Sequence, residues 1–192
     1  MESILVSTGV VTLVEIGDKT QLLAFILAAR FKKPVPIILG ILVATLVNHG
    51  LAGALGAWIT STVSPEVLRW VLGLSFMGMA AWTLIPDKIE EEETQVAVRF
   101  GVFGATLITF FLAEMGDKTQ IATIAMAAHY ASPLMVVIGT TLGMLIADVP
   151  AVFVGDKLAD KIPMKLVHSI AAGIFALLGL ATLLGAGSGL GF

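Results

Sequence analysis

Residues 15–21 read Glu-Ile-Gly-Asp-Lys-Thr-Gln, and residues 114–120 read Glu-Met-Gly-Asp-Lys-Thr-Gln. The two stretches lie 99 positions apart and differ at a single position. Each lies inside a long apolar segment and brings two acids and one lysine into it. This duplicated acidic motif indicates a chain built from two repeats, and it is the starting point for predicting both the fold and the site.

The composition of the 192-residue chain is that of an integral membrane protein. Apolar residues make up 57% of it, charged residues only 13%, and the mean hydropathy is +0.99. Soluble domains have about 25% charged residues. The net charge of −3, without a basic stripe, argues against a nucleic-acid binder. The absence of cysteine excludes disulfides, thiolate metal sites and Fe–S clusters.

Six segments are apolar and long enough to cross a bilayer, for which a helix needs about 20 residues. Prolines and charged residues separate them, as expected at helix ends. The first segment lacks a basic leader and a small-residue cleavage site, so we expect a retained helix rather than a signal peptide. The predicted spans are Ile4–Ala29, Pro34–Thr60, Val67–Ile85, Phe100–Ala128, Pro133–Val154 and Met164–Leu184.

The offset of 99 residues extends beyond the motif, since it also aligns Pro34 with Pro133 and Phe76 with Phe175. A three-helix unit is therefore used twice, and because three is odd, the second copy enters the membrane from the opposite side. Inverted repeats are typical of secondary transporters. The predicted fold is an all-α, polytopic membrane protein with six transmembrane helices in two inverted repeats. The predicted division is a single domain over 1–192, with repeat one at 4–85, an acidic cytoplasmic linker at 86–99 and repeat two at 100–184.

The positive charges predict the orientation. Of the eleven Lys and Arg residues, eight fall on one face, Arg69 falls on the other, and Lys19 and Lys118 lie inside spans. Cytoplasmic loops are enriched in Lys and Arg, so the face with eight is predicted to be cytoplasmic and both termini extracytoplasmic, in a bacterial inner (plasma) membrane. The eight are Arg30, Lys32, Lys33, Lys88, Arg99, Lys157, Lys161 and Lys165.

The ionisable motif residues are the candidate site. Each would cost about 2.5–3.5 kcal/mol at the bilayer centre, so they are expected to face inward. The acids and the glutamine of each motif are spaced three apart, which predicts that they lie along one helix face, and the inverted repeat would bring the two faces together. Gly17 and Gly116 would allow close packing and also local unwinding that frees carbonyl oxygens as extra ligands. The predicted cation ligands are Glu15, Asp18, Gln21, Glu114, Asp117 and Gln120.

A carboxylate-rich oxygen site selects Mg²⁺, Ca²⁺ or Mn²⁺. The four carboxylates and two lysines carry a formal charge of −2, which one divalent ion would neutralise. An empty cluster of carboxylates is expected to collect protons, because like charges repel. Competition between cation and proton is a direct route to antiport. No resident cofactor is expected, and no nucleophile–base pair, catalytic metal cluster or ATP-binding motif points to an enzyme.

Alternatives stay open for the polar residues around these ligands. Glu and Lys four positions apart within each motif could form structural ion pairs. Lys19 and Lys118 fit counter-charges better than ligands, because an ammonium group only donates. Thr20 and Thr119 fit helix caps or bonds to neighbouring helices, whereas Gln21 and Gln120 fit a ligand and an interhelical hydrogen bond equally.

Three further polar residues lie within spans: Asn48 and His49 in the second and Asp148 in the fifth. At the offset of 99, His49 corresponds to Asp148. Together with Lys19, Lys118, Thr20 and Thr119, they could surround the main site or form a proton relay beside it. Alternatively, they could be buried polar residues bonded to a neighbouring helix. His129 and His168 are expected to be solvated at the membrane edges.

The two intact Glu-x-Gly-Asp-Lys-Thr copies resemble the hallmark of a family of small membrane proteins, formerly uncharacterised, that exchange Mn²⁺ or Ca²⁺ for protons. Eukaryotic members serve Golgi and chloroplast membranes. Bacterial members include manganese exporters, and the short N-terminus here is similar to theirs. The resemblance covers essentially the whole chain and implies that Glu15, Asp18, Glu114 and Asp117 form the cation path.

The expected function is therefore export of a divalent cation, Mn²⁺ first and Ca²⁺ second, by proton antiport. The expected partners are the cation, protons and the lipid bilayer, not nucleic acid, and the sequence leaves the oligomeric state open. The alternative is a channel or uniporter for the same ions, which would use the same carboxylates without proton coupling. The inverted repeat favours alternating access.

Overall fold

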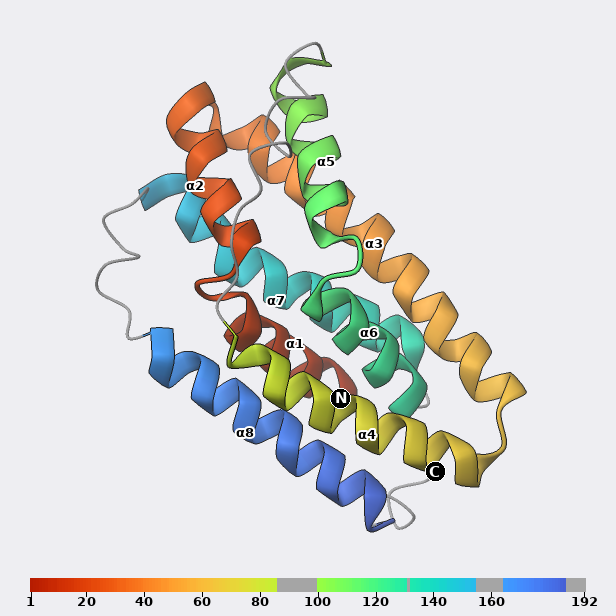
Figure 1. Ribbon diagram of the computed structural model, residues 1–192. Helices are drawn as coiled ribbons and strands as arrows, with labels where there is room; N and C mark the ends of the chain where they lie inside the picture. Colours follow the sequence, from red (N-terminus) through yellow and green to blue (C-terminus); the bar gives the residue numbers. More distant parts are fainter. Residues whose placement is uncertain (86–99, 131, 155–163, 186–192) are drawn as a thin grey trace.

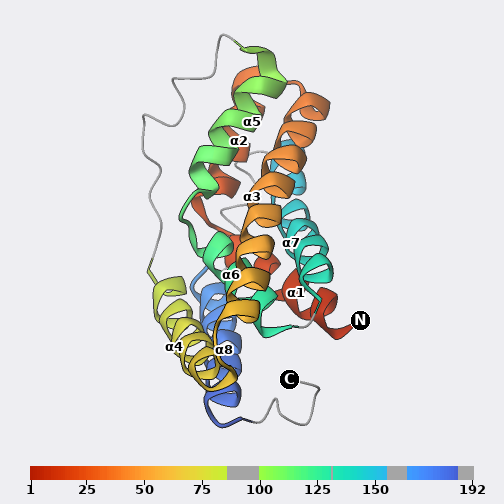
Figure 2. The same cartoon turned by 90° about the vertical axis from the view of Figure 1, so that its right-hand side faces the viewer.

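The computed structural model describes residues 1–85, 100–130, 132–154 and 164–185, and these form eight α-helices (Figures 1 and 2). The predicted all-α fold is confirmed over this part of the chain. The predicted linker 86–99 lies outside the described residues, as do Lys88, Arg99, Lys157 and Lys161. The helices are α1 (Glu2–Glu15), α2 (Lys19–Phe31), α3 (Pro34–Thr62), α4 (Pro65–Thr83), α5 (Gly101–Glu114), α6 (Lys118–His129), α7 (Pro133–Val154) and α8 (Met164–Leu183).

Two helices among the described residues are long and apolar enough to cross a bilayer unaided: Pro34–Thr62 and Pro133–Phe153. Each begins with a proline, which fits the first helical turn because its missing N–H would have no partner there. Two shorter helices, Gly101–Glu114 and His168–Leu183, are also apolar. The first and fourth predicted spans are each divided into two helices, so neither half has the length of a full crossing.

The main helix–helix contacts of one repeat have counterparts between the corresponding helices of the other. α1 packs against α7 as α5 packs against α3, and α3 packs against α6 as α7 packs against α2. Corresponding helices run in opposite directions, as α3 and α7 do in Figure 1. α3 and α7 also contact one another and form the centre of the bundle. The packing is that of two copies related by an approximate two-fold rotation.

Glycines let the central helices approach closely at corresponding positions. A Cβ atom on Gly40 would lie 2.7 Å from the Cβ of Thr106, so α3 meets α5 at backbone distance. Gly139, the counterpart of Gly40, makes the same approach to Ser7 and Ile4 on α1. Small residues at helix contacts are the usual means of tight packing in membranes. The helices that lead into the two motifs, α1 and α5, therefore pack closely against α7 and α3.

The last helix of each repeat joins its counterpart in an antiparallel pair, α4 with α8 (Figure 1). Phe76 and Phe175 stack between them, with ring centroids 6.3 Å apart and 23° between the planes. This pair packs against α6 and α1, and contacts α2 and α5 marginally at most. Figure 2 shows the pair beside one end of the bundle, with α2 and α5 at the other. The two-fold relation within the bundle is thus broken by the position of the α4–α8 pair.

Candidate functional site

Both motifs interrupt a helix at the same point. α1 ends at Glu15 and α2 begins at Lys19, and α5 ends at Glu114 where α6 begins at Lys118. At the centre of the breaks, Gly17 has φ 86° and Gly116 has φ 78°, values that disfavour any residue with a side chain. The prediction that the motif acids lie three apart on one continuous helical face is therefore wrong. The predicted local unwinding at the glycines is confirmed.

The two breaks have the same internal hydrogen bonds. The amide N–H of Asp18 donates to the Glu15 carbonyl at 3.0 Å, and that of Asp117 donates to the Glu114 carbonyl at 3.1 Å. Each motif glycine donates its N–H to the glutamine four residues later, Gly17 to Gln21 Oε1 at 2.9 Å and Gly116 to Gln120 Oε1 at 2.8 Å. The repeated sequence thus encodes a repeated backbone shape, and the glutamines stabilise it.

The glutamine amides also reach the central helices. Gln21 Nε2 donates to the carbonyl of Ala147 on α7 at 3.0 Å, and Gln120 Nε2 donates to Asn48 Oδ1 on α3 at 3.3 Å. Asn48 in turn donates from Nδ2 to the carbonyl of Phe111 on α5 at 3.1 Å. Ala147 corresponds to Asn48, so the two contacts are equivalent. Of the two roles considered for the glutamines, the interhelical hydrogen bond is present in both repeats.

The aspartates and lysines of the two motifs pair across the repeats. Lys118 Nζ lies 3.9 Å from Asp18 Oδ1, and Lys19 Nζ lies 3.7 Å from Asp117 Oδ2. Three of the four side chains are at most 3% exposed, and Lys19 is 19% exposed. Within the described residues, no Glu–Lys pair joins positions four apart inside a motif, so that alternative is wrong. The exchanged pairs bring the two motifs together at the centre of the bundle.

Lys118 has a further contact that has no counterpart at Lys19 within the described residues. Its Nζ donates to the carbonyl of Ile85, just past the end of α4, at 3.0 Å. The carboxylate of Asp117 also accepts a bond from the Lys118 backbone N–H at 2.7 Å, capping α6. The second motif is therefore tied to α4 by a buried ammonium group.

The two motif glutamates are fully buried but differently satisfied. Glu114 Oε2 accepts from Thr119 Oγ1 at 3.0 Å and lies 3.6 Å from His49 Nε2. Neither carboxylate oxygen of Glu15 has a hydrogen-bond partner in the described structure, nor does the hydroxyl of Thr20. Buried polar groups are nearly always satisfied, so the unsatisfied oxygens of Glu15 are where an absent positive partner is expected.

Asp148 on α7 is a further buried acid close to this cluster. It is 0% exposed, and neither of its carboxylate oxygens has a hydrogen-bond partner in the described part of the chain. It lies within electrostatic range of Glu15 and Glu114. The structure therefore brings the motif carboxylates, Asp148, Asn48 and His49 into one buried region, although no three His, Asp or Glu side chains among the described residues already form a metal-binding group.

Two histidines expected to be solvated are instead partly buried. His168, near the start of α8, is partly buried and donates from Nε2 to the carbonyl of Ile16 in the first break at 2.9 Å. His129, at the end of α6, packs edge-on against Phe76, with ring centroids 5.7 Å apart. The sequence carries little signal for these contacts, because both depend on where the α4–α8 pair lies.

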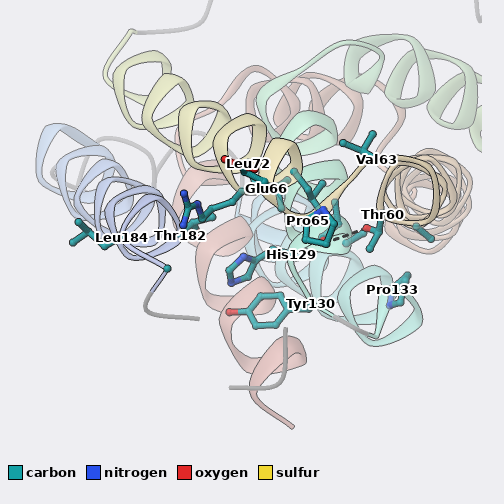
Figure 3. Close-up of a pocket in the computed structure, with 16 residues that line it drawn as sticks. Thr60, Val63, Pro65, Glu66, Leu72, His129, Tyr130, Pro133, Thr182 and Leu184 are labelled. Carbon is teal, nitrogen blue, oxygen red and sulfur yellow. Dashed lines mark hydrogen bonds between the residues drawn. The ribbon is translucent and has the colours of Figure 1, made fainter. Parts of the chain in front are cut away.

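A cavity of about 960 Å³ lies at the end of the bundle where α3 and α6 end and α4 begins (Figure 3). Its lining is largely apolar, and no residue of either motif belongs to it. It is therefore separate from the candidate site. The polar residues around it are Thr60, Glu66, Arg69, His129, Tyr130 and Thr182.

Comparison with known proteins agrees with the duplicated structure. The model of the family described as divalent cation/proton antiporter GDT1 matches the chain twice, over residues 3–91 and 102–189. A Vibrio cholerae serotype O1 protein named "Putative manganese exporter" is 52% identical over 95% of this chain and 90% of its own length. The "GDT1-like protein 3" of Oryza sativa subsp. indica is 30% identical over 91% of this chain and 71% of its own. No solved structure matches the chain.

Proposed function

Because this chain belongs to the divalent cation/proton antiporter GDT1 family, whose members are membrane transporters, we propose that it exports Mn²⁺ from the bacterial cytoplasm in exchange for protons. Ca²⁺ is a secondary substrate. The 52% identity to a protein named as a manganese exporter favours Mn²⁺ as the main cargo. Cation and proton are both substrates, so the transport cycle needs no resident cofactor.

The proposed cation ligands are the carboxylates of Glu15, Asp18, Glu114 and Asp117. The observation that carries this assignment is the exchange of charges between the repeats, in which each motif aspartate faces the lysine of the other motif. A divalent ion entering between the breaks would replace an ammonium group as the partner of each aspartate. The same ion would supply the positive charge that the buried carboxylate of Glu15 lacks.

Gln21 and Gln120 support this site in two ways. Their amide oxygens hold the motif glycines and so fix the carbonyls around each break. Each oxygen has a second lone pair that remains available to a cation. Helix ends and unwound carbonyls are common cation ligands in transporters, which makes these breaks suitable for a hard divalent ion.

Proton coupling follows from the same groups. When the cation leaves, the buried carboxylates must recover a positive partner, and the available ones are protons and the two motif lysines. Cation binding must expel those protons, so an inward proton gradient drives the cation outward. Because the lysines neutralise part of the cluster, we expect the apparent cation affinity to weaken gradually with falling pH.

The proposed topology is six crossings with both termini outside the cytoplasm. Each broken helix pair, α1 with α2 and α5 with α6, would cross the inner membrane as one unit. The bias of eight to one in Lys and Arg sets the orientation. Since the chain has no native cysteine, cysteines introduced at Ser3 and Thr94 should react with an impermeant reagent from opposite sides. Labelling of both from one side would contradict this topology.

Uptake of Mn²⁺ and of Ca²⁺ into inside-out membrane vesicles tests the function as a whole. We expect an imposed pH gradient, acid inside the vesicle, to drive accumulation of Mn²⁺ above that of Ca²⁺. Vesicles without the protein provide the control. Accumulation that is independent of the gradient would favour a channel or uniporter, and the absence of accumulation of either ion would contradict cation export.

A further inference from the structure

His49 is buried without the partners that a buried imidazole normally has. Its exposed fraction is 0%, and neither Nδ1 nor Nε2 has a hydrogen-bond partner in the described structure. Its neighbour Asn48, by contrast, donates to the Phe111 carbonyl and accepts from Gln120. A core histidine with a purely structural role would be expected to use at least one ring nitrogen. The unused ring nitrogens make His49 a candidate ligand rather than a purely structural residue.

The nearest polar atom to His49 belongs to the candidate site. His49 Nε2 lies 3.6 Å from Glu114 Oε2, too far for a good hydrogen bond. That oxygen is held by Thr119 Oγ1 at 3.0 Å, while Glu114 Oε1 has no hydrogen-bond partner. Two ligands of one ion, each about 2.1 Å from it, are about 3–4.2 Å apart. The separation of the two side chains therefore suits a cation held between them.

The repeats differ in donor chemistry at this position, although their motifs are nearly identical. Asp148 corresponds to His49, so by the repeat the counterpart of the Glu114–His49 pair is Glu15 with Asp148, two carboxylates in place of a carboxylate and an imidazole. Asp148 is also fully buried without a hydrogen-bond partner in the described structure. The pseudo-symmetry thus equates an oxygen donor in one half with a nitrogen donor in the other.

We propose that His49 is a direct ligand of the transported cation through Nε2, beside Glu114, and that it selects transition-metal ions over alkaline-earth ions. This inference rests on the proposed function and adds the basis of its selectivity. Ca²⁺ and Mg²⁺ are bound by oxygen ligands. Imidazole nitrogen instead favours first-row transition metals, with affinity rising from Mn²⁺ through Fe²⁺ to Co²⁺. The substrate class is therefore divalent first-row metals, with Glu15 and Asp148 as the oxygen donors available to complete the site.

Replacing His49 by Asp makes the two repeats alike and converts the site to oxygen donors alone. In proteoliposomes we expect the ratio of Mn²⁺ to Ca²⁺ transport to fall by about tenfold or more, since even indirect partners of metal ligands change affinity by about 10–100-fold. Transport of Ca²⁺ should persist. Co²⁺ should compete with Mn²⁺ better than Ca²⁺ does in the unaltered protein, and lose this advantage in His49→Asp. Thr45→Val, one helical turn away at another buried position, is the matched control and should leave the ratio unchanged.

Pulsed electron paramagnetic resonance of bound Mn²⁺ gives a readout that does not depend on transport. Imidazole nitrogen modulates the Mn²⁺ spin echo, and we expect this modulation in the purified protein and its loss in both His49→Asp and His49→Gln. The other two histidines lie at the end of α6 and the start of α8, so their signals would not respond. The second variant covers the case in which the new charge prevents folding.

The outcomes separate the two proposals. If the unaltered protein transports neither ion, the proposed function is wrong. If it transports Mn²⁺ but the nitrogen modulation is absent, or persists in the variants, His49 is not a ligand. Equal losses of Mn²⁺ and Ca²⁺ transport in both variants would assign His49 a structural role and overturn the inference.

Discussion

The two helix breaks have almost the same sequence and the same internal hydrogen bonds, yet their surroundings differ. The first break is covered by α8, whose His168 donates to the Ile16 carbonyl. The corresponding residue in the second break, Met115, is 54% exposed. Conversely, the buried Glu114 has Thr119 and His49 beside it, whereas Glu15 has no hydrogen-bond partner in the described structure. The two breaks thus differ both in their contact with α8 and in the side chains beside their glutamates.

This difference shows what an inverted repeat adds to a transporter. The motif sequence determines the local shape of each break, so the shape is repeated. The α4–α8 pair contains one helix from each repeat and packs as a unit, so it can cover the break of only one repeat at a time. A second state with the roles of the repeats exchanged would be built from the same contacts at corresponding residues, which is the structural requirement for alternating access.

The largest expected effect is loss of transport when one motif carboxylate is neutralised. Glu15→Gln, Asp18→Asn, Glu114→Gln and Asp117→Asn should each lower Mn²⁺ flux by about 100-fold or more, because each removes charge needed to balance the cation and the lysines. Corresponding variants should be equally impaired, despite the unequal surroundings of the two breaks. Manganese tolerance of exporter-deficient cells measures this effect, and Glu2→Gln on the exposed N-terminal turn is the control. Full tolerance in two or more of the four would contradict the proposed site.

Exchange of the two repeats can be followed by cross-linking. By the offset of 99, Arg69 corresponds to His168 and Met115 to Ile16. A short bifunctional thiol reagent should link cysteines placed at residues 16 and 168 in the state described here. The pair at residues 69 and 115 should link only in the exchanged state. Excess Mn²⁺ and low pH should shift the two yields in opposite directions. Yields that rise and fall together would exclude an exchange of roles.

The glycine in each break should have a moderate effect on stability. A Cβ on Gly116 would meet no atom within 4 Å, so Gly116→Ala tests the positive φ of 78° alone. Alanine in this region costs about 1–2 kcal/mol. Gly17→Ala should cost a similar amount, since its φ is 86°. Thermal unfolding in detergent measures the loss, and Gly9→Ala, in a regular helix with open space around it, should not destabilise. Equal unfolding temperatures for all three variants would contradict the positive φ assigned to Gly17 and Gly116.

The smallest effect separates the two motif threonines. Thr119 donates to the buried carboxylate of Glu114, whereas the hydroxyl of Thr20 has no partner in the described structure. Thr119→Val should therefore lower the free energy of unfolding by about 0.5–1.5 kcal/mol, and Thr20→Val should be nearly neutral. Chemical unfolding of the two variants under identical conditions gives the comparison. A larger loss of unfolding free energy in Thr20→Val than in Thr119→Val would contradict the assignment of the hydrogen bond to Thr119 alone.

Much of this organisation could be predicted from the sequence. The duplicated motif and its offset correctly predicted the repeats, the all-helical fold and the gathering of the motif carboxylates. The pattern of apolar residues could not show that each motif interrupts its helix, because hydropathy depends on side chains and not on the backbone angle φ of a glycine. The exchanged pairs, Asp18 with Lys118 and Asp117 with Lys19, were also missed. Spacing along one helix favours pairs within a motif, whereas contacts across the bundle depend on tertiary packing.

The contacts of His168 and Lys118 with neighbouring elements were beyond the sequence for a different reason. They depend on where the α4–α8 pair packs. The sequence does not specify this position, because the pair could pack equally well against either repeat. The sequence does show His49 as a departure from the repeat, since it corresponds to Asp148 at the offset of 99, but it does not show that both side chains are buried without a hydrogen-bond partner in the described structure. A difference between repeats at an otherwise equivalent buried position is a useful signal for specificity.

Coupled fluxes of Mn²⁺ and protons in proteoliposomes test the central claim most directly. The membrane potential is clamped, only the pH difference is varied, and both fluxes are recorded in the same vesicles. We predict that Mn²⁺ moves against its own gradient when protons flow the opposite way, and that Glu15→Gln and Glu114→Gln abolish both fluxes together. A Mn²⁺ flux insensitive to the pH difference, without any accompanying proton movement, would contradict antiport and leave a channel or uniporter as the better description.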